Sequence, residues 1–203
     1  EEWRSKSMGF RIYSFFGEVP DPALVSGAVA RSAFRPSILL RLSFDNCDGK
    51  DEMTGLFGMQ GIRRPLSDST NGALLGMASN DCFGFAINPA ADVEEVMDWS
   101  VINATFNCNH SLCRLASEGG LRFRIPAHSR AEYIIALGVY RDGIITSGRR
   151  AYAYYTCFFE DLEDVLESAL DETEESLCKA KKLDDMLESS GLSEDRCFLI
   201  AQA

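Results

Sequence analysis

The sequence predicts a mainly β protein, an antiparallel β-sandwich followed by one long linker helix, so that the chain is α+β overall. Two observations predict this class. From Phe10 to Tyr140 the chain repeats short apolar or alternating runs, and turn-forming residues separate them. About eight short strands without long helices between them favour an antiparallel sandwich over a parallel α/β sheet. After Gly148 the apolar period changes from two residues to three and four, which indicates a helix.

The run from Ser37 to Phe44 is the clearest predicted strand. Its apolar residues Ile38, Leu40, Leu42 and Phe44 alternate with Arg41 and Ser43. This is the period of a strand with one buried and one polar face. The other predicted strands, in chain order, are Phe10 to Phe16, Thr54 to Gln60, Ala73 to Ser79, Cys82 to Ile87, Leu112 to Ala116, Leu121 to Ile125 and Glu132 to Tyr140.

The segment from Asp92 to Trp99 is the exception within this region. Val93, Val96 and Met97 recur there at helical spacing. The spacing predicts a helical turn or an irregular excursion rather than a strand.

The long helix is predicted from Asp161 onward. Its apolar stripe consists of Leu162, Val165, Leu166, Ala169, Leu170, Leu177, Ala180, Leu183, Met186 and Leu187. Thr173 and Glu174 weaken the stripe at its middle. An uninterrupted helix here would be about 45 Å long. Gly191 is the predicted C-terminal cap, and Ser193 is predicted to open a second helix that runs to the end of the chain.

The charge of the chain is concentrated in this helical region. The chain of 203 residues has a net charge of −11, and residues 160–196 hold 14 of the 31 acidic residues against 4 of the 20 basic ones. A sequence pI near 4.7 argues against binding to nucleic acid, because that binding depends on clustered lysine and arginine. No apolar run approaches the roughly 20 residues that span a bilayer. We therefore expect a soluble, cytoplasmic protein that binds neither nucleic acid nor membrane.

The seven cysteines show no paired spacing, and several lie in apolar runs. This pattern predicts buried free thiols rather than a disulfide framework. Cys108, His110, Cys113 and His128 could together supply four zinc ligands, but their spacing is not a common one for structural zinc. The glycine-rich stretch from Gly55 to Gly61 lacks the Lys-Ser/Thr ending of a phosphate-binding loop. We expect no cofactor and no metal.

Two polar or aromatic segments remain as candidate contact sites. Arg63 and Arg64 precede Asp68 on a predicted loop. One interpretation is that the two arginines are solvated or form an ion pair with Asp68. The other is that they contact a substrate or a neighbouring domain. The aromatic run from Tyr152 to Phe159 either packs the sheet against the helix or stacks on sugar rings, and the first interpretation is favoured because buried aromatics contribute so much contact area.

Several of these segments, taken in order, form a sequence pattern that spans nearly the whole chain. They are Phe10 to Ser14 with Val19 to Pro22, Leu42 to Asn46, Phe57-Gly58 with Gly61, Arg63-Arg64 before Asp68, Tyr140 to Gly143, Thr146 to Gly148, Tyr154 to Phe159, and Leu192 to Asp195 leading to Phe198 and to Ala201 through Ala203. In this set the chain resembles glycoside hydrolase family 52, the β-xylosidases. The residues from Asp92 to Asn109 align poorly with that pattern, and Cys157 stands where a basic residue is expected.

The resemblance implies a fold and a function for the parent protein. It implies an N-terminal β-sandwich joined to an (α/α)6 barrel, and retaining cleavage of xylose from xylo-oligosaccharides by two barrel carboxylates. The implied division is residues 1–148 as a sandwich domain incomplete at its N-terminus, residues 149–191 as junction and connecting helix, and residues 192–203 as the start of a truncated helical domain. No catalytic residue is expected within this chain.

The implied partners are a carbohydrate in the intact protein and the chain's own helical barrel, with a homodimer left open. Arg63, Arg64 and Asp68 are the best candidates for substrate or interdomain contact. A rival interpretation is a free-standing β-sandwich module that binds a carbohydrate or a protein partner and has no enzymatic activity.

Overall fold

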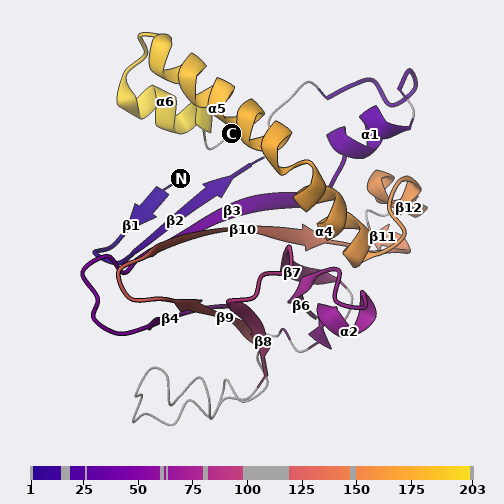
Figure 1. Cartoon of the computed structure of the whole chain (residues 1–203). Coiled ribbons are helices and arrows are strands. Elements are labelled where there is room, and N and C mark those ends of the chain that lie inside the picture. The colour runs from indigo at the N-terminus through magenta and orange to yellow at the C-terminus, as the bar shows by residue number, and fades with distance from the viewer. Residues whose placement is uncertain are drawn as a thin grey trace.

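The computed structural model describes residues 2–14, 19–25, 27–59, 62, 64–79, 82–97, 119–146 and 150–201 (Figure 1). These residues form antiparallel sheets with a few helices, so the predicted mainly β class is confirmed. Within the described residues, no helix combines the length and the apolar composition that crossing a bilayer requires.

The larger sheet has seven strands in the order β1-β2-β3-β10-β7-β6-β5. In that order the strands are Glu2–Arg4, Met8–Tyr13, Ser37–Asp45, Arg130–Val139, Phe83–Ile87, Leu75–Ser79 and Arg64–Pro65. The longest pairing joins β3 to β10, with Asp45 opposite Arg130 and Ser37 opposite Gly138. Each described pair in the sheet is antiparallel.

A second sheet packs against one face of the larger one. Its strands β4 (Met53–Gly58), β9 (Gly120–Ile125) and β8 (Val93–Val96) lie below the larger sheet in Figure 1. The core between the sheets contains Leu40, Leu42 and Phe44 of β3 together with residues of β9 such as Phe123. The alternation along β3 therefore directs these three side chains toward one core, as the sequence predicts.

Helices cover the opposite face of the larger sheet. The helices α4 (Leu162–Asp171) and α5 (Thr173–Ser189) lie above β3 and β10 in Figure 1. The sheet surface beneath α4 includes several small residues, and these allow a close approach; they are Ala78, Ala86, Ala136, Gly84 and Gly138. A Cβ atom added to Gly138 of β10 would lie 3.1 Å from side-chain atoms of both Val165 and Leu166. The helix is therefore seated on a second apolar core.

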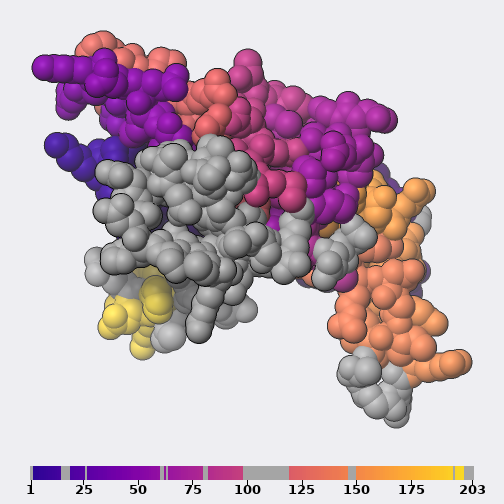
Figure 2. All heavy atoms as spheres, turned by 90° about the horizontal axis from the view of Figure 1, so that it is seen from below, coloured from indigo at the N-terminus to yellow at the C-terminus, as the bar shows by residue number. Residues whose placement is uncertain are grey.

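The remaining elements are short. They are α1 (Ala28–Ala33), α2 (Leu66–Ser69), the 3-10 turn η1 (Tyr154–Cys157), α6 (Glu194–Ala201), and the hairpin of β11 (Ile144–Thr146) with β12 (Arg150–Tyr152). Figure 2 shows the hairpin region standing away from the body of the molecule. The side chain of Tyr152 on β12 is 62% exposed.

Most predicted strands are confirmed within a few residues, and two predictions are wrong. Residues Val93–Val96 form a strand that pairs with β9, and the side chains of Glu94 and Glu95 bind partners on neighbouring strands. The predicted uninterrupted helix is interrupted at Glu172, where α4 ends and α5 begins. The predicted strand from Leu112 to Ala116 lies outside the described residues.

Candidate functional site

The sequence candidates Arg64 and Asp68 lie on one corner of the molecule, formed by β5 and α2 (residues 64–69, here called the α2 corner). Pro65 ends the short strand with φ −66° and ψ 139°, and the helical turn begins at the next residue. Leu66 is fully buried in the core beneath α4 and anchors the turn. A proline followed by a buried leucine thus fixes the position of the corner. Arg63 lies outside the described residues.

Arg64 binds helix α4 rather than Asp68. Its Nη1 atom donates to Glu163 Oε1 at 2.8 Å and to Ser69 Oγ at 2.8 Å. Ser69 Oγ in turn donates to Glu163 Oε1 at 2.9 Å. The predicted alternative of an ion pair between Arg64 and Asp68 is therefore not what the structure contains. Arg64 fastens the α2 corner to the first turn of α4.

Glu163 is held as an anion in this arrangement. Burial by itself would raise the pKa of its carboxyl, but the hydrogen bonds from Arg64 and Ser69 outweigh burial and the pKa is lowered. Its place in the first turn of α4 also favours a negative charge. A general acid needs the opposite shift, so this carboxylate is suited to structure and not to proton donation.

Glu95 of β8 braces the same corner from the other side. Its Oε1 atom accepts hydrogen bonds from the backbone N–H groups of Ser67 at 3.0 Å and Gly76 at 2.7 Å, and Ser67 Oγ donates to Oε2. The carboxylate therefore links β8, α2 and β6. No pattern in the sequence pairs Glu95 or Glu163 with residues 64–69, and sequence reasoning missed both.

Asp68 is the exposed member of the corner. It lies in the single turn of α2. Among the described residues it has no hydrogen-bond or ion-pair partner. The α2 corner thus presents one free carboxylate on a braced backbone. The oxygens of this carboxylate can accept hydrogen bonds from hydroxyl groups or pair with a cation.

The aromatic run lies at the same N-terminal end of α4, against α1. The ring of Tyr154 packs edge-on against Phe34 at 4.9 Å between centroids and against Phe158 at 5.0 Å. Arg31 of α1 lies over the ring of Phe159 at 4.3 Å and donates to Asp164 of α4. These side chains therefore join the junction to α1 and α4, whereas the favoured interpretation of the run predicts packing of the sheet against the helix.

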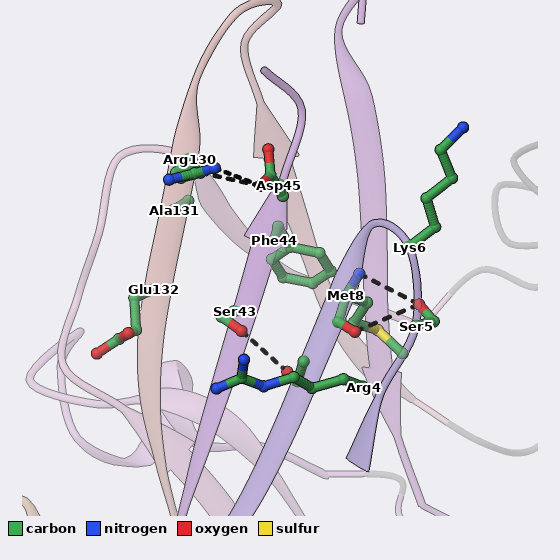
Figure 3. Close-up of a pocket in the computed structure, with 11 residues that line it drawn as sticks. Arg4, Ser5, Lys6, Met8, Ser43, Phe44, Asp45, Arg130, Ala131 and Glu132 are labelled. Atoms are coloured by element: carbon green, nitrogen blue, oxygen red, sulfur yellow. Dashed lines mark hydrogen bonds and ion pairs between the residues drawn. The ribbon is translucent and has the colours of Figure 1, made fainter. Parts of the chain in front are cut away.

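A surface hollow of about 430 Å³ lies at the end of the larger sheet where β1 turns into β2 and where β3 pairs with β10 (Figure 3). Its lining includes Ser43, Asp45, Arg130 and Glu132. Arg130 Nε donates to Asp45 Oδ2 at 2.9 Å, and Arg41 Nε lies 3.2 Å from Glu132 Oε1. The pKa of Asp45 is lowered, chiefly by the backbone N–H of Cys47 and further by Arg130. The lowered pKa makes the Asp45 carboxyl a poor proton donor, and the described charges of the hollow lie in ion pairs.

The metal hypothesis can be tested only at His128. Cys108, His110 and Cys113 lie outside the described residues. The Nδ1 atom of His128 lies 3.0 Å from the carbonyl oxygen of Cys47. Within the part of the chain that the structure describes, no group of three or more potential ligands is assembled.

The described cysteines are free thiols, as predicted, but they are not buried. Cys47, Cys82, Cys157 and Cys178 are exposed, and Cys197 is intermediate. The prediction of burial is wrong because these residues lie at strand ends, in turns or on outer helix faces, as Cys82 does just before β7.

Comparisons with known proteins agree over the whole chain. Residues 1–203 match the family described as Glycosyl hydrolase family 52. A β-xylosidase of Geobacillus stearothermophilus is 26% identical over 210 residues, covering 100% of this chain and 30% of that protein. A second β-xylosidase of the same organism is 28% identical over 210 residues, covering 100% of this chain and 34% of that protein. The chain spans about a third of the length of these curated relatives.

Proposed function

The chain belongs to glycosyl hydrolase family 52, and from this we propose that it is the non-catalytic sandwich and connector portion of a retaining β-xylosidase that acts on xylo-oligosaccharides. The match over all 203 residues is the observation that carries the proposal. The names of the two relatives support the substrate class.

The electrostatics of the described carboxylates support a non-catalytic role. The described carboxyl groups with resolved pKa shifts are Asp45, Glu163 and Glu175, and each has a lowered pKa. A retaining glycosidase needs one carboxyl group with a raised pKa to protonate the leaving group, and a second about 5 to 5.5 Å away as nucleophile. In the proposed parent protein, both groups lie in the helical domain.

The proposed division of the chain follows from this role. Residues 1–148 are the sandwich domain, residues 149–191 the junction and connector, and residues 192–203 the opening of an (α/α)6 barrel. The fully buried Leu162, Val165 and Leu166 of α4 support a connector that is rigidly attached to the sandwich. The proposed setting is the cytoplasm, and a homodimer is compatible with it.

The proposed contact residues have two different roles. Asp68 and Arg63 contact the sugar or the barrel, whereas Arg64 positions Asp68 by holding the α2 corner on α4. The bracing by Glu163 and Glu95 supports this assignment, because a contact residue is most effective on a backbone that its neighbours hold in place.

The decisive test compares the isolated chain with the full-length parent protein on an aryl β-xyloside. The parent should release the aryl group, whereas the isolated chain should release none above the uncatalysed rate. Turnover by the isolated chain at a rate comparable to the parent would refute the non-catalytic role. A parent that cleaves another aryl glycoside in preference to the xyloside would refute the substrate assignment alone.

A free-standing binding module is the second candidate, and the exposure of two aromatic rings favours it. Trp3 on the edge strand β1 is 54% exposed, and Tyr152 on the projecting hairpin is 62% exposed. Exposed aromatic rings can stack on sugar faces. Titration of the isolated chain with xylo-oligosaccharides by calorimetry distinguishes the candidates, because saturable heat that is lost in Trp3→Ala or Tyr152→Ala would favour the module.

A further inference from the structure

The interruption between α4 and α5 has no cause in the local sequence. The residues around it are Leu170, Asp171, Glu172, Thr173 and Glu174, none of which is glycine or proline. Glu172 nevertheless has φ −95° and ψ 19°. It is the C-cap of α4 and also the N-cap of α5. None of these residue types has a helix propensity low enough to end a helix by itself. A tertiary contact must therefore interrupt the helix.

The side chain of Arg35 lies at this interruption. Arg35 follows α1 closely in sequence, and its side chain is only 1% exposed. Its Nη1 atom donates to the Ser168 carbonyl oxygen at 2.8 Å, and its Nη2 atom donates to Ser176 Oγ at 3.3 Å. Ser168 belongs to α4 and Ser176 to α5, so one guanidinium group binds both helices.

This contact shares an acceptor with the hydrogen-bond ladder of the helix, which keeps its bond from the Glu172 N–H to the Ser168 carbonyl. In a regular α-helix the Ser168 carbonyl would accept from the N–H of Glu172. That bond is 3.3 Å long here, whereas Arg35 lies at 2.8 Å from the same oxygen. The next carbonyl, that of Ala169, is approached by Thr173 Oγ1 at 3.4 Å. A side chain that inserts into the ladder is a recognised cause of a helix kink.

Glu172 completes the arrangement. Its Oε2 atom lies 2.9 Å from Arg35 Nη1 and accepts a hydrogen bond from Ser32 Oγ of α1 at 2.7 Å. The other charged groups that act on Arg35 are Glu175 of α5 and Arg31 of α1. A buried guanidinium needs such a partner, because removing it from water is costly. The carboxylate thus holds Arg35 in the ladder and fastens α1 to the start of α5.

We propose that Arg35 is a positioning residue that interrupts the connecting helix at Glu172 and joins the start of α5 to α1. Without the guanidinium, the Ser168 carbonyl accepts from Glu172 alone, and α4 and α5 merge into one regular helix. The helix interruption at Glu172, here called the joint, lies within this chain. Testing the role of Arg35 at the joint therefore requires no assay of glycoside cleavage.

The experiment is backbone NMR of the isotopically labelled chain with Arg35→Met, which keeps the length and apolar stem of the side chain and removes its donors. We expect the Cα resonance of Glu172 to move to helical values and the amide exchange of Glu172 to slow. Arg31→Met is the matched control, because Arg31 lies on α1 and donates its hydrogen bond to a different carboxylate of α4, that of Asp164. The control should leave the Glu172 resonances unchanged.

Two outcomes would overturn the proposal. Unchanged Glu172 resonances in Arg35→Met would mean that the interruption does not depend on the guanidinium. The same change in both variants would mean a general loosening of α1 from α4. If Arg35→Met does not fold, Arg35→Lys replaces it, because lysine keeps the charge for Glu172 but lacks the planar fork that reaches both helices. A native Glu172 resonance in Arg35→Lys would then count against the proposal.

Discussion

Replacement of Leu166 by alanine should test whether α4 is part of the folded core. Leu166 is fully buried, and its side chain reaches the surface of β10 at Gly138. The substitution removes three methylene equivalents, worth about 2.4 kcal/mol in transfer free energy. A residual void of about 50 Å³ would add about 1.2 kcal/mol at about 24 cal/mol per Å³. We therefore expect a loss of about 3.5 kcal/mol in the free energy of unfolding.

The assay is urea unfolding followed by circular dichroism, with the denaturant slope compared between variants. Leu183→Ala is the matched control, since Leu183 is a half-buried leucine of the same apolar stripe on α5. It should cost less than about 1.5 kcal/mol, because a partly exposed side chain loses less transfer free energy and leaves no closed cavity. Equal losses in the two variants would refute the conclusion that α4 is seated more deeply in the core than the Leu183 turn of α5.

Two further predictions concern polar side chains. Because the pKa of Glu163 is lowered in the folded chain, its ion pair stabilises the fold above the carboxyl's ordinary pKa of 4.5 and is lost as the pH falls through the lower folded-state value. Glu163→Gln should therefore flatten the acid limb of a stability-versus-pH curve, and a limb as steep as that of the unmodified chain would contradict this. Asn46 is buried, and its Nδ2 atom donates to the carbonyl oxygens of Asp51, Ile125 and Pro126. Asn46→Ala should cost about 1–3 kcal/mol in chemical denaturation, and an unchanged midpoint would show that water substitutes for the amide.

The sequence predicts most strands of the sheets, but it does not predict the strand from Val93 to Val96. β3 is predictable because its alternation of leucine with Arg41 and Ser43 reflects a single local constraint, one face toward a core. Residues Val93–Val96 are misjudged because a spacing of three is compatible with a helix, and the strand is held by Glu94 and Glu95 through distant partners. Local periodicity carries no information about such contacts.

The candidate site at the α2 corner also depends on contacts between residues that are far apart in the sequence. Arg64 and Asp68 are recognisable as a polar pair beside a turn, but the pairing of Arg64 with Glu163 spans 99 residues and decides which of the two stays free. The six-residue helix α1 offers too few positions to show an apolar period. Its role becomes visible only when Arg31 and Arg35 meet helix α4, more than 130 residues later in the chain.

The long pairing of β3 with β10 has a consequence for the synthesis of the protein. Asp45 and Arg130 are 85 residues apart, and β10 lies between β3 and β7 in the sheet. At about 5–20 residues per second, a ribosome needs roughly 4 to 17 s to make the intervening chain. During that interval the edge of β3 that will pair with β10 has no hydrogen-bonding partner. We therefore expect the nascent chain to depend on chaperones most strongly between the synthesis of Asp45 and that of Arg130.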